Sequence, residues 1–165
     1  MPDEPRAPPR IDLELEITGA TRSLMMFTLH YRLVLANRSD RAVNDLAIAV
    51  QLASAQRGQS NAAPLAAARS LAQVERIGPN QSRSIVGEVQ MPLAAIAPIM
   101  QGRTRLFIPL VHVTLEGQGQ LATARSFVVG NPGTGAEGRV QPLPLDQPPG
   151  SLPGLRARPI APPAD

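Results

Sequence analysis

The stretch that decides the fold of this chain is RLFIPLVHVTLEGQGQLATARSFVV, residues 105–129. Two runs of mainly aliphatic and β-branched residues flank a short Gly-Gln-Gly connection, and this arrangement predicts a β-hairpin. Pro109 in the first arm cannot donate a hydrogen bond to a neighbouring strand, so we expect that arm to lie at a sheet edge or to carry a bulge. The second arm alternates between its two faces, which is typical of a half-buried strand.

Five further stretches upstream have the pattern of strands, and they are residues 11–18, 24–36, 46–52, 71–77 and 83–89. The first three alternate between apolar and polar or small side chains, so each predicts one buried face. The residues expected to face inward are Phe27, Leu29, Tyr31, Leu33 and Leu35 in 24–36, and Leu46, Ile48, Val50 and Leu52 in 46–52. The turn Asn37-Arg38-Ser39-Asp40 predicts a hairpin-like unit between the second and third stretches, and Gly78-Pro79-Asn80-Gln81 is a tight-turn sequence between the last two. Residues 92–100 are interrupted by Pro and predict a single helical turn. About seven strands with little helix predict an all-β, two-sheet antiparallel sandwich.

Proline divides the chain into a domain and two tails. Residues 1–10 contain four Pro, residues 131–165 contain nine, and the 120 residues between them contain five. Because Pro lacks a backbone donor and fixes φ, dense Pro favours extended, solvated chain. We therefore expect a single domain over residues 11–130, with Pro-rich extended tails at 1–10 and 131–165. The small, polar and Ala-rich stretch 54–70 predicts an exposed loop with a short helical turn near residues 65–70, and it is a candidate contact surface.

The composition sets limits on the class of protein. The chain has 165 residues, of which 43% are hydrophobic and only 2% aromatic, so its core must be built from aliphatic side chains. The net charge is +3, but every basic residue is Arg and the Arg residues are scattered rather than clustered, which argues against nucleic-acid binding. No Cys is available for a disulfide or a thiolate. No stretch approaches the ~20 apolar residues of a membrane span, and we expect a soluble chain.

Acidic residues alternate along the first predicted strand, at Asp12, Glu14 and Glu16. The alternatives are a cation-binding edge and a solvated outer face. Side chains two residues apart on a strand point the same way but do not converge on one ion without help from other elements. The sequence favours the solvated face.

The sequence contains no pattern that assigns a catalytic, cofactor-binding or metal-binding residue, and we expect a protein that is not an enzyme. His30 and His112 are the only histidines, and neither has the neighbouring ligands that a stable metal site needs. The segments Asn37-Arg38-Ser39 and Asn80-Gln81-Ser82 match the glycosylation acceptor pattern but are better interpreted as turns. Residues 140–163 allow two interpretations. One is a docking segment in polyproline II form, and the favoured one is a linker or a strap that lays leucines on the sandwich, namely Leu143, Leu145, Leu152 and Leu155.

The runs LHYRLVLANRSDRAVNDLAIAVQL (29–52) and VERIGPNQSRSIVGEVQMP (74–92), followed by the hairpin, resemble bacterial immunoglobulin-like modules of the CARDB type. Asn80 stands where these modules usually have Gly. Residues 11–160 are also similar to a group of uncharacterised bacterial proteins that share the LFIPLV and SFVVG segments. In that group a membrane-spanning segment and a Pro-rich linker precede the sandwich. The resemblance implies an immunoglobulin-like fold and a possible membrane association through a segment absent from this chain, and it implies no catalytic residue.

These observations together predict a non-catalytic immunoglobulin-like module that binds a protein partner or acts as a scaffold at the bacterial cell envelope, through its loops or a sheet edge. The alternative is a module that binds a small ligand or a carbohydrate. Such a module would present exposed aromatic rings for stacking, and the chain has only four aromatics, all within predicted strands. No nucleic-acid partner and no cofactor are expected.

Overall fold

The computed structural model describes residues 11–54, 69–96, 98–117, 123–132, 140–146 and 148–160. These residues form thirteen strands and one 3-10 helix, η1 (Leu93–Ala95). The strands are β1 (Ile11–Arg22), β2 (Met26–Asn37), β3 (Val43–Ser54), β4 (Arg69–Ile77), β5 (Ser82–Pro92), β6 (Ile99–Gln101), β7 (Thr104–Phe107), β8 (Pro109–Glu116), β9 (Thr123–Pro132), β10 (Val140–Gln141), β11 (Leu143–Pro144), β12 (Gly150–Ser151) and β13 (Arg156–Pro159). The predicted all-β class and the single helical turn within 92–100 are confirmed.

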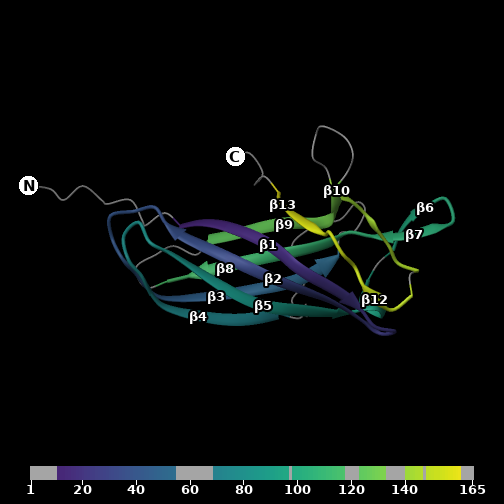
Figure 1. Ribbon diagram of the computed structural model, residues 1–165, viewed down its shortest axis with the longest axis horizontal. Coiled ribbons are helices and arrows are strands. Elements are labelled where there is room, and N and C mark those ends of the chain that lie inside the picture. Colours follow the sequence, from purple (N-terminus) through teal and green to yellow (C-terminus); the bar gives the residue numbers. More distant parts are fainter. Residues whose placement is uncertain are drawn as a thin grey trace, which may run out of the picture.

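The strands form three antiparallel sheets (Figure 1). The four-stranded sheet has the order β12-β1-β2-β5. The six-stranded sheet has the order β10-β9-β8-β3-β4, with β13 also paired to β9, and the small third sheet is β11-β7-β6. The expected number of about seven strands describes only those of eight residues or more, and short strands of two to four residues complete the sheets.

The predicted hairpin is present, but its first arm is divided. Leu110 to Leu115 in β8 pair with Val128 to Thr123 in β9. Residues 104–107 belong instead to β7 in the third sheet, and the chain leaves one sheet for the other at Ile108. Pro109 is the first residue of β8, which lies between β3 and β9, so the expected edge position or bulge is wrong. An interior strand tolerates Pro at its first residue, where no ladder bond depends on the missing donor. Most of the Gly-Gln-Gly connection lies outside the described residues.

The two predicted turns are corners between sheets. The 37–40 turn leads from β2 in the four-stranded sheet to β3 in the six-stranded sheet, so the hairpin-like pairing of these two strands is wrong. The 78–81 turn leads back from β4 to β5. Asn37 is completely buried where the two corners meet, and its Nδ2 donates to the carbonyl oxygens of Arg41 (2.7 Å), Ile77 (3.1 Å) and Gly78 (3.2 Å). One amide side chain therefore joins both corners.

One apolar core lies between the two larger sheets and reaches the third. The side chains predicted to face inward from 24–36 are all buried, and they are Phe27, Leu29, Tyr31, Leu33 and Leu35. Those predicted from 46–52 are also buried, at Leu46, Ile48, Val50 and Leu52. Phe27 of β2 meets Phe107 of β7 edge to face, with ring centroids 5.2 Å apart. The inward faces predicted for these two strands are confirmed.

Residues 140–146 and 148–160, here called the C-terminal strap, pack on all three sheets (Figure 1). Short strands of the strap pair with β9, β7, β1 and again β9 in turn. Its leucines enter the core, with Leu143, Leu145 and Leu155 buried and Leu152 partly buried. The extended chain expected for 131–165 is therefore not what the structure shows over these residues, and the strap interpretation describes them. Leucines at intervals anchor the segment, while Pro limits each of its strands to a few residues.

Candidate interaction surfaces

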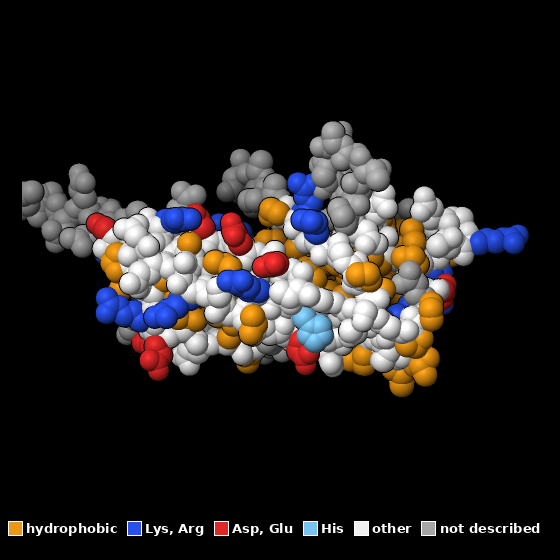
Figure 2. Space-filling view, viewed as in Figure 1, with side chains coloured by type: hydrophobic (Ala, Val, Ile, Leu, Met, Phe, Trp, Pro, Cys, Tyr) orange, Lys and Arg blue, Asp and Glu red, His pale blue; other side chains and the backbone are white. Residues whose placement is uncertain are grey.

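The turn between β1 and β2 presents two large apolar side chains to solvent. Leu24 is 83% exposed and Met25 is 75% exposed. Figure 2 shows hydrophobic side chains gathered at this end of the molecule, at the lower right. We call Ser23, Leu24 and Met25 the apolar tip. Scattered single apolar residues are normal on a surface, but two neighbours at the end of a hairpin form a patch that the fold itself does not use.

Hydrogen bonds of the Ser23 side chain and of the backbone fix the apolar tip. The hydroxyl of Ser23 accepts hydrogen bonds from the amides of Met25 (3.3 Å) and Met26 (3.0 Å), and the Ser23 amide donates to the Met26 carbonyl (2.9 Å). The amide of Leu93, the first residue of η1, donates to the Met25 carbonyl (2.8 Å), which ties the tip to the segment that follows β5. A Ser side chain that bonds the following amides is a standard way of fixing a tight turn. The two apolar side chains are therefore presented by an ordered turn.

A second surface is the open side of the two larger sheets. β5 is the last strand of the four-stranded sheet and β4 is the last strand of the six-stranded sheet. Each carries one strongly exposed aliphatic side chain, Val86 on β5 at 75% and Leu71 on β4 at 69%. On the opposite side, β12 pairs with one end of β1, and β10 and β13 cover β9. Unpaired edges are the places where a sheet can add a further strand.

A shallow groove of about 600 Å³ runs over the outer face of β4, β3 and β8. Its lining includes the small side chains of Ala47 and Ala49 and the polar side chains of Gln73, Thr114 and Glu116. No aromatic ring lines it. All four aromatic residues of the chain are at most 4% exposed. The stacking platform that a carbohydrate site needs is therefore not provided by any aromatic residue of this chain.

The two histidines lie on opposite outer faces of the molecule. His30 projects from the four-stranded sheet and its Nδ1 lies 3.4 Å from Glu88 on the neighbouring strand β5. His112 projects from the six-stranded sheet, where its Nδ1 is 2.8 Å from the hydroxyl of Ser126 on β9. They cannot share an ion across the core. Within the described ranges no group of three or more His, Asp or Glu side chains has the arrangement of a metal site.

His112 lies on the outer face of the six-stranded sheet and is nevertheless buried, with 8% of the residue exposed. Burial lowers the pKa of its imidazole, since the charged form loses hydration. Its Nε2 is also buried and has no hydrogen-bond partner in the described part of the chain. These features favour a neutral ring that donates or accepts only through Nδ1. They define a polar residue within the surface of the sheet, whose neighbours in register are Gln51 and Ser126.

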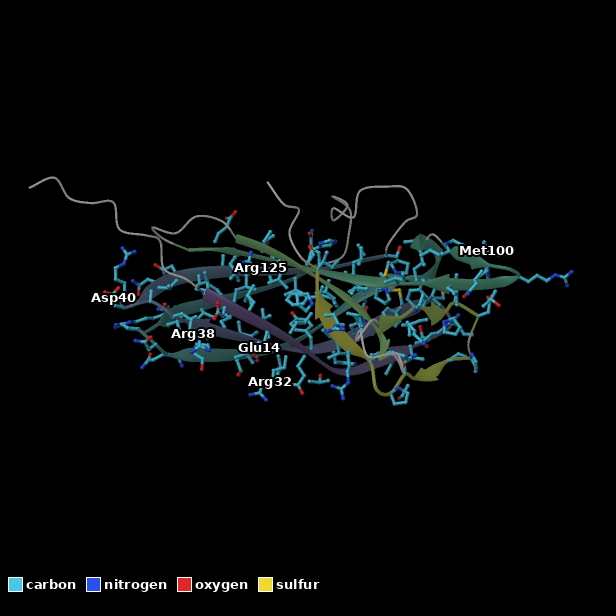
Figure 3. All side chains as sticks on the ribbon, turned by 90° about the horizontal axis from the view of Figure 1, so that it is seen from above. Glu14, Arg32, Arg38, Asp40, Met100 and Arg125 are labelled. Carbon is cyan, nitrogen blue, oxygen red and sulfur yellow. The ribbon has the colours of Figure 1, made fainter. Side chains whose placement is uncertain are left out.

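The acidic residues of β1 face outward beside basic residues of the same sheet and its turn. The carboxylate of Asp12 lies 3.3 Å from Nε of Arg38, in an exposed ion pair. Glu14 and Glu16 are exposed, and Glu16 is opposite Arg32 on β2. Figure 3 shows Glu14, Arg32 and Arg38 along the same flank of the molecule. This arrangement is the solvated face that the sequence favours over a cation site.

The two glycosylation patterns lie at the corners between the sheets. Asn37 is completely buried and its side-chain oxygen accepts from the amide (3.0 Å) and the hydroxyl (2.7 Å) of Ser39. Asn80 occupies a turn with φ of 56°, a conformation in which Asn is the usual substitute for Gly. Both segments are turns, as predicted. The candidate contact loop 54–70 falls almost entirely outside the described residues, although Arg69 and Ser70 begin β4 and are not helical.

Sequence reasoning missed the apolar tip and the exposed valine of β5, although both leave a signal. Leu24, Met25 and Met26 precede Phe27 as an unbroken apolar run, so alternation cannot bury all of them. In β5, Val86 stands between Ser84 and Glu88 on the face that is otherwise polar. An apolar residue on the wrong face of a strand indicates a contact that the strand's own sheet does not make.

No protein-family model matches this chain, and no curated protein sequence matches it. The part of the chain that the structure describes contains no helix long and apolar enough to cross a membrane.

Proposed function

We propose that this chain is a non-catalytic, immunoglobulin-like β-sandwich module that binds another protein through its apolar tip. The seven long strands support the fold. β1, β2 and β5 lie in one sheet and β3, β4, β8 and β9 lie in the other, with one core between them. This order fits an immunoglobulin-like sandwich in which the fourth strand pairs with the third instead of with the fifth.

The observation that carries the proposal is the exposure of Leu24 and Met25 on a turn fixed by Ser23. Burial of a Leu or Met side chain contributes about 1.5–3 kcal/mol, and a preorganised turn loses little further entropy on binding. The fold gains nothing from leaving both in water. The occupant that fits them is an apolar pocket on a partner protein. On the basis of the resemblance to anchored bacterial proteins, we place this contact at the cell envelope.

The carbohydrate alternative has less support, because every aromatic ring is buried. An enzyme has less support as well, because we find no cluster of titratable side chains that could form an active site among the described residues. Instead, these side chains form exposed pairs such as Arg105 with Asp146 and Arg38 with Asp12. We assign no catalytic residue and no cofactor.

The test is a quantitative capture experiment from a detergent extract of the native cells, with three forms of the full chain as baits. The double variant Leu24→Asp/Met25→Asp should lose the partner retained by the wild-type chain. The matched control is Leu71→Asp, which changes an aliphatic residue of similar exposure on β4 and should retain the partner. A photo-crosslinking residue at position 25 should then attach covalently to the same protein. Equal retention by all three baits, or no specific partner for the wild-type chain, would refute the proposal.

A further inference from the structure

Among the described residues, the C-terminal strap adds strands to one side of the molecule and no strand is added to the other side. The C-terminal strap covers β9 and one end of β1, while β4 and β5 end their sheets with no further strand among the described residues. β5 is the longer of the two open strands. Its pairing with β2 runs without a shift from Ser82 to Pro92, so no bulge turns this edge away from a neighbour.

β5 has only one of the features that usually protect an edge strand, a charge on its inward face. That charge, Arg83, is the second residue of the strand, and its Nε donates to the carbonyl oxygen of Arg76 (3.3 Å). Natural edges carry inward-pointing charges, bulges or a Pro within the strand. In β5 the Pro comes only at its last residue, and the buried or half-buried positions are Ile85, Gly87, Val89 and Met91. At the centre of the outward face, Val86 is 75% exposed. A long, regular edge with an exposed aliphatic residue at its centre is suited to strand addition.

We infer that two copies of this chain associate through β5, antiparallel and about a two-fold axis at Val86. The occupant of the edge is thus a second copy, and the product is a continuous sheet in which β5 of one copy pairs with β5 of the other. A two-fold axis makes the contact self-complementary, so one exposed Val buries the other. Directly opposite residues in such a pair have Cα atoms about 4.5–5.5 Å apart.

Charge complementarity selects this register. With Val86 opposite itself, Glu88 of one copy lies opposite Ser84 of the other. In each copy the Arg32 guanidinium donates to the Ser84 hydroxyl at 3.3 Å, so it already extends over the position that the second copy's Glu88 would face. Two Arg32–Glu88 pairs therefore flank the central valines, one on each side. Both side chains are exposed in the single chain, where Glu88 lies 3.4 Å from Nδ1 of His30.

The inward face fits the same register. Ile85 of one copy falls opposite Gly87 of the other, where no side chain competes for the space. Gly87 itself is required within each copy, because a Cβ there would lie 2.6 Å from the hydroxyl oxygen of the buried Tyr31. The half-buried Ile85 thus gains cover from the neighbouring strand without a clash.

The absence of Cys from the chain allows a direct test of the register. A Val86→Cys variant places two thiols directly opposite one another, within the Cα separation of about 4.4–6.8 Å that a disulfide requires. Mild oxidation of the full chain should convert it to a covalent dimer. The matched control is Ser84→Cys, whose two thiols would be about 13 Å apart along the strands. We expect it to cross-link at least about tenfold more slowly. Equal rates, or faster reaction of the control, would overturn the inference.

The ion pairs are tested by charge reversal in sedimentation velocity over a range of concentrations. The wild-type chain should show a concentration-dependent dimer. Glu88→Arg and Arg32→Glu should each weaken it by about tenfold, since like charges then face one another, and the double variant should recover most of the loss. Circular dichroism should be unchanged in all three. A monomeric wild-type chain, or a double variant no better than the single ones, would overturn the inference, whereas partner capture by the apolar tip would be unaffected.

Discussion

At the scale of the residue, His112 shows how burial controls a charge. Its neighbours in register are Gln51 on β3 and Ser126 on β9, and neither carries a charge that would stabilise an imidazolium. Desolvation is the cause of its lowered pKa. The buried, unpartnered Nε2 points to the same conclusion, because a proton there would have no acceptor in the described structure. The folded chain therefore favours neutral His112.

This burial predicts a pH dependence of the free energy of unfolding. In the unfolded chain His112 takes up a proton as the pH falls below its ordinary pKa of 6.5, whereas in the folded chain it does so only at lower pH. Folding stability should thus fall with decreasing pH below 6.5, until the pH passes the lowered folded pKa. The measurement is urea unfolding between pH 7.5 and 5.

The matched variant is His112→Gln, which keeps a polar group beside Ser126 but cannot titrate. In this variant, the free energy of unfolding should lose most of its dependence on pH between pH 6.5 and 5. An identical dependence on pH in His112→Gln and the wild-type chain would show that the buried ring is not its origin.

At the scale of the element, the C-terminal strap converts a Pro-rich segment into part of the folded body. Leu155 is 6% exposed and lies with Leu15 and Ile17 of β1 beside a groove of about 380 Å³. The Arg22 guanidinium donates to the Leu145 carbonyl, and Nε of Arg105 donates to Asp146 at 3.0 Å. Because that ion pair is exposed, we expect the leucines rather than the charges to hold the strap.

We predict that Leu155→Ala lowers the free energy of unfolding by about 2–4 kcal/mol, since it removes a buried aliphatic side chain between the strap and β1. The control is Leu24→Ala at the exposed tip, which should change it by no more than about 0.5 kcal/mol. Both are measured by urea unfolding. Similar small effects for the two variants would mean that the strap is not bound to the body in solution.

The strands show which parts of the fold could be predicted from the sequence. Alternation located β2 and β3 because one buried face gives a period of two, and it identified Phe27 to Leu35 as the inward set. It did not reveal that Asn37 begins a corner between sheets, because an Asx turn has the same local sequence in a hairpin and in a crossover. Only the distant carbonyls of Ile77 and Gly78 distinguish the two. The division at Ile108 was missed because the sheet that a strand joins depends on long-range pairing, which the local sequence of residues 105–110 does not reveal.

The candidate surfaces were less predictable than the fold. The sequence pointed to loops and sheet edges in general. Which strand lies at an edge depends on long-range pairing, however, and β5 lies at the edge of its sheet because the two corners move the chain into the other sheet and back again. Val86 and Leu24 are conspicuous only once their exposure is known. Binding residues carry no period, whereas core residues repeat with the geometry of the strand.

At the scale of the whole molecule, the three sheets share one core. Figure 3 places Asp40, beside the first corner, and Met100 of the third sheet at opposite ends of the long axis. Between them the core is continuous and includes Phe27 from the four-stranded sheet, Phe107 from the third sheet and Phe127 from the six-stranded sheet. A shared core of this kind predicts that the sheets unfold together.

We therefore predict that Phe27→Ala and Phe127→Ala each lower the free energy of unfolding by about 3–5 kcal/mol, because each deletes a large buried ring. The chain has one Tyr and no Trp, so its fluorescence reports on Tyr31 in β2 alone, whereas far-ultraviolet circular dichroism reports on all strands. The two signals should give coincident transitions in each variant, including Phe127→Ala, whose substitution lies in the opposite sheet from Tyr31. Separate transitions would contradict the single core, since the four-stranded sheet would then survive the loss of the six-stranded one.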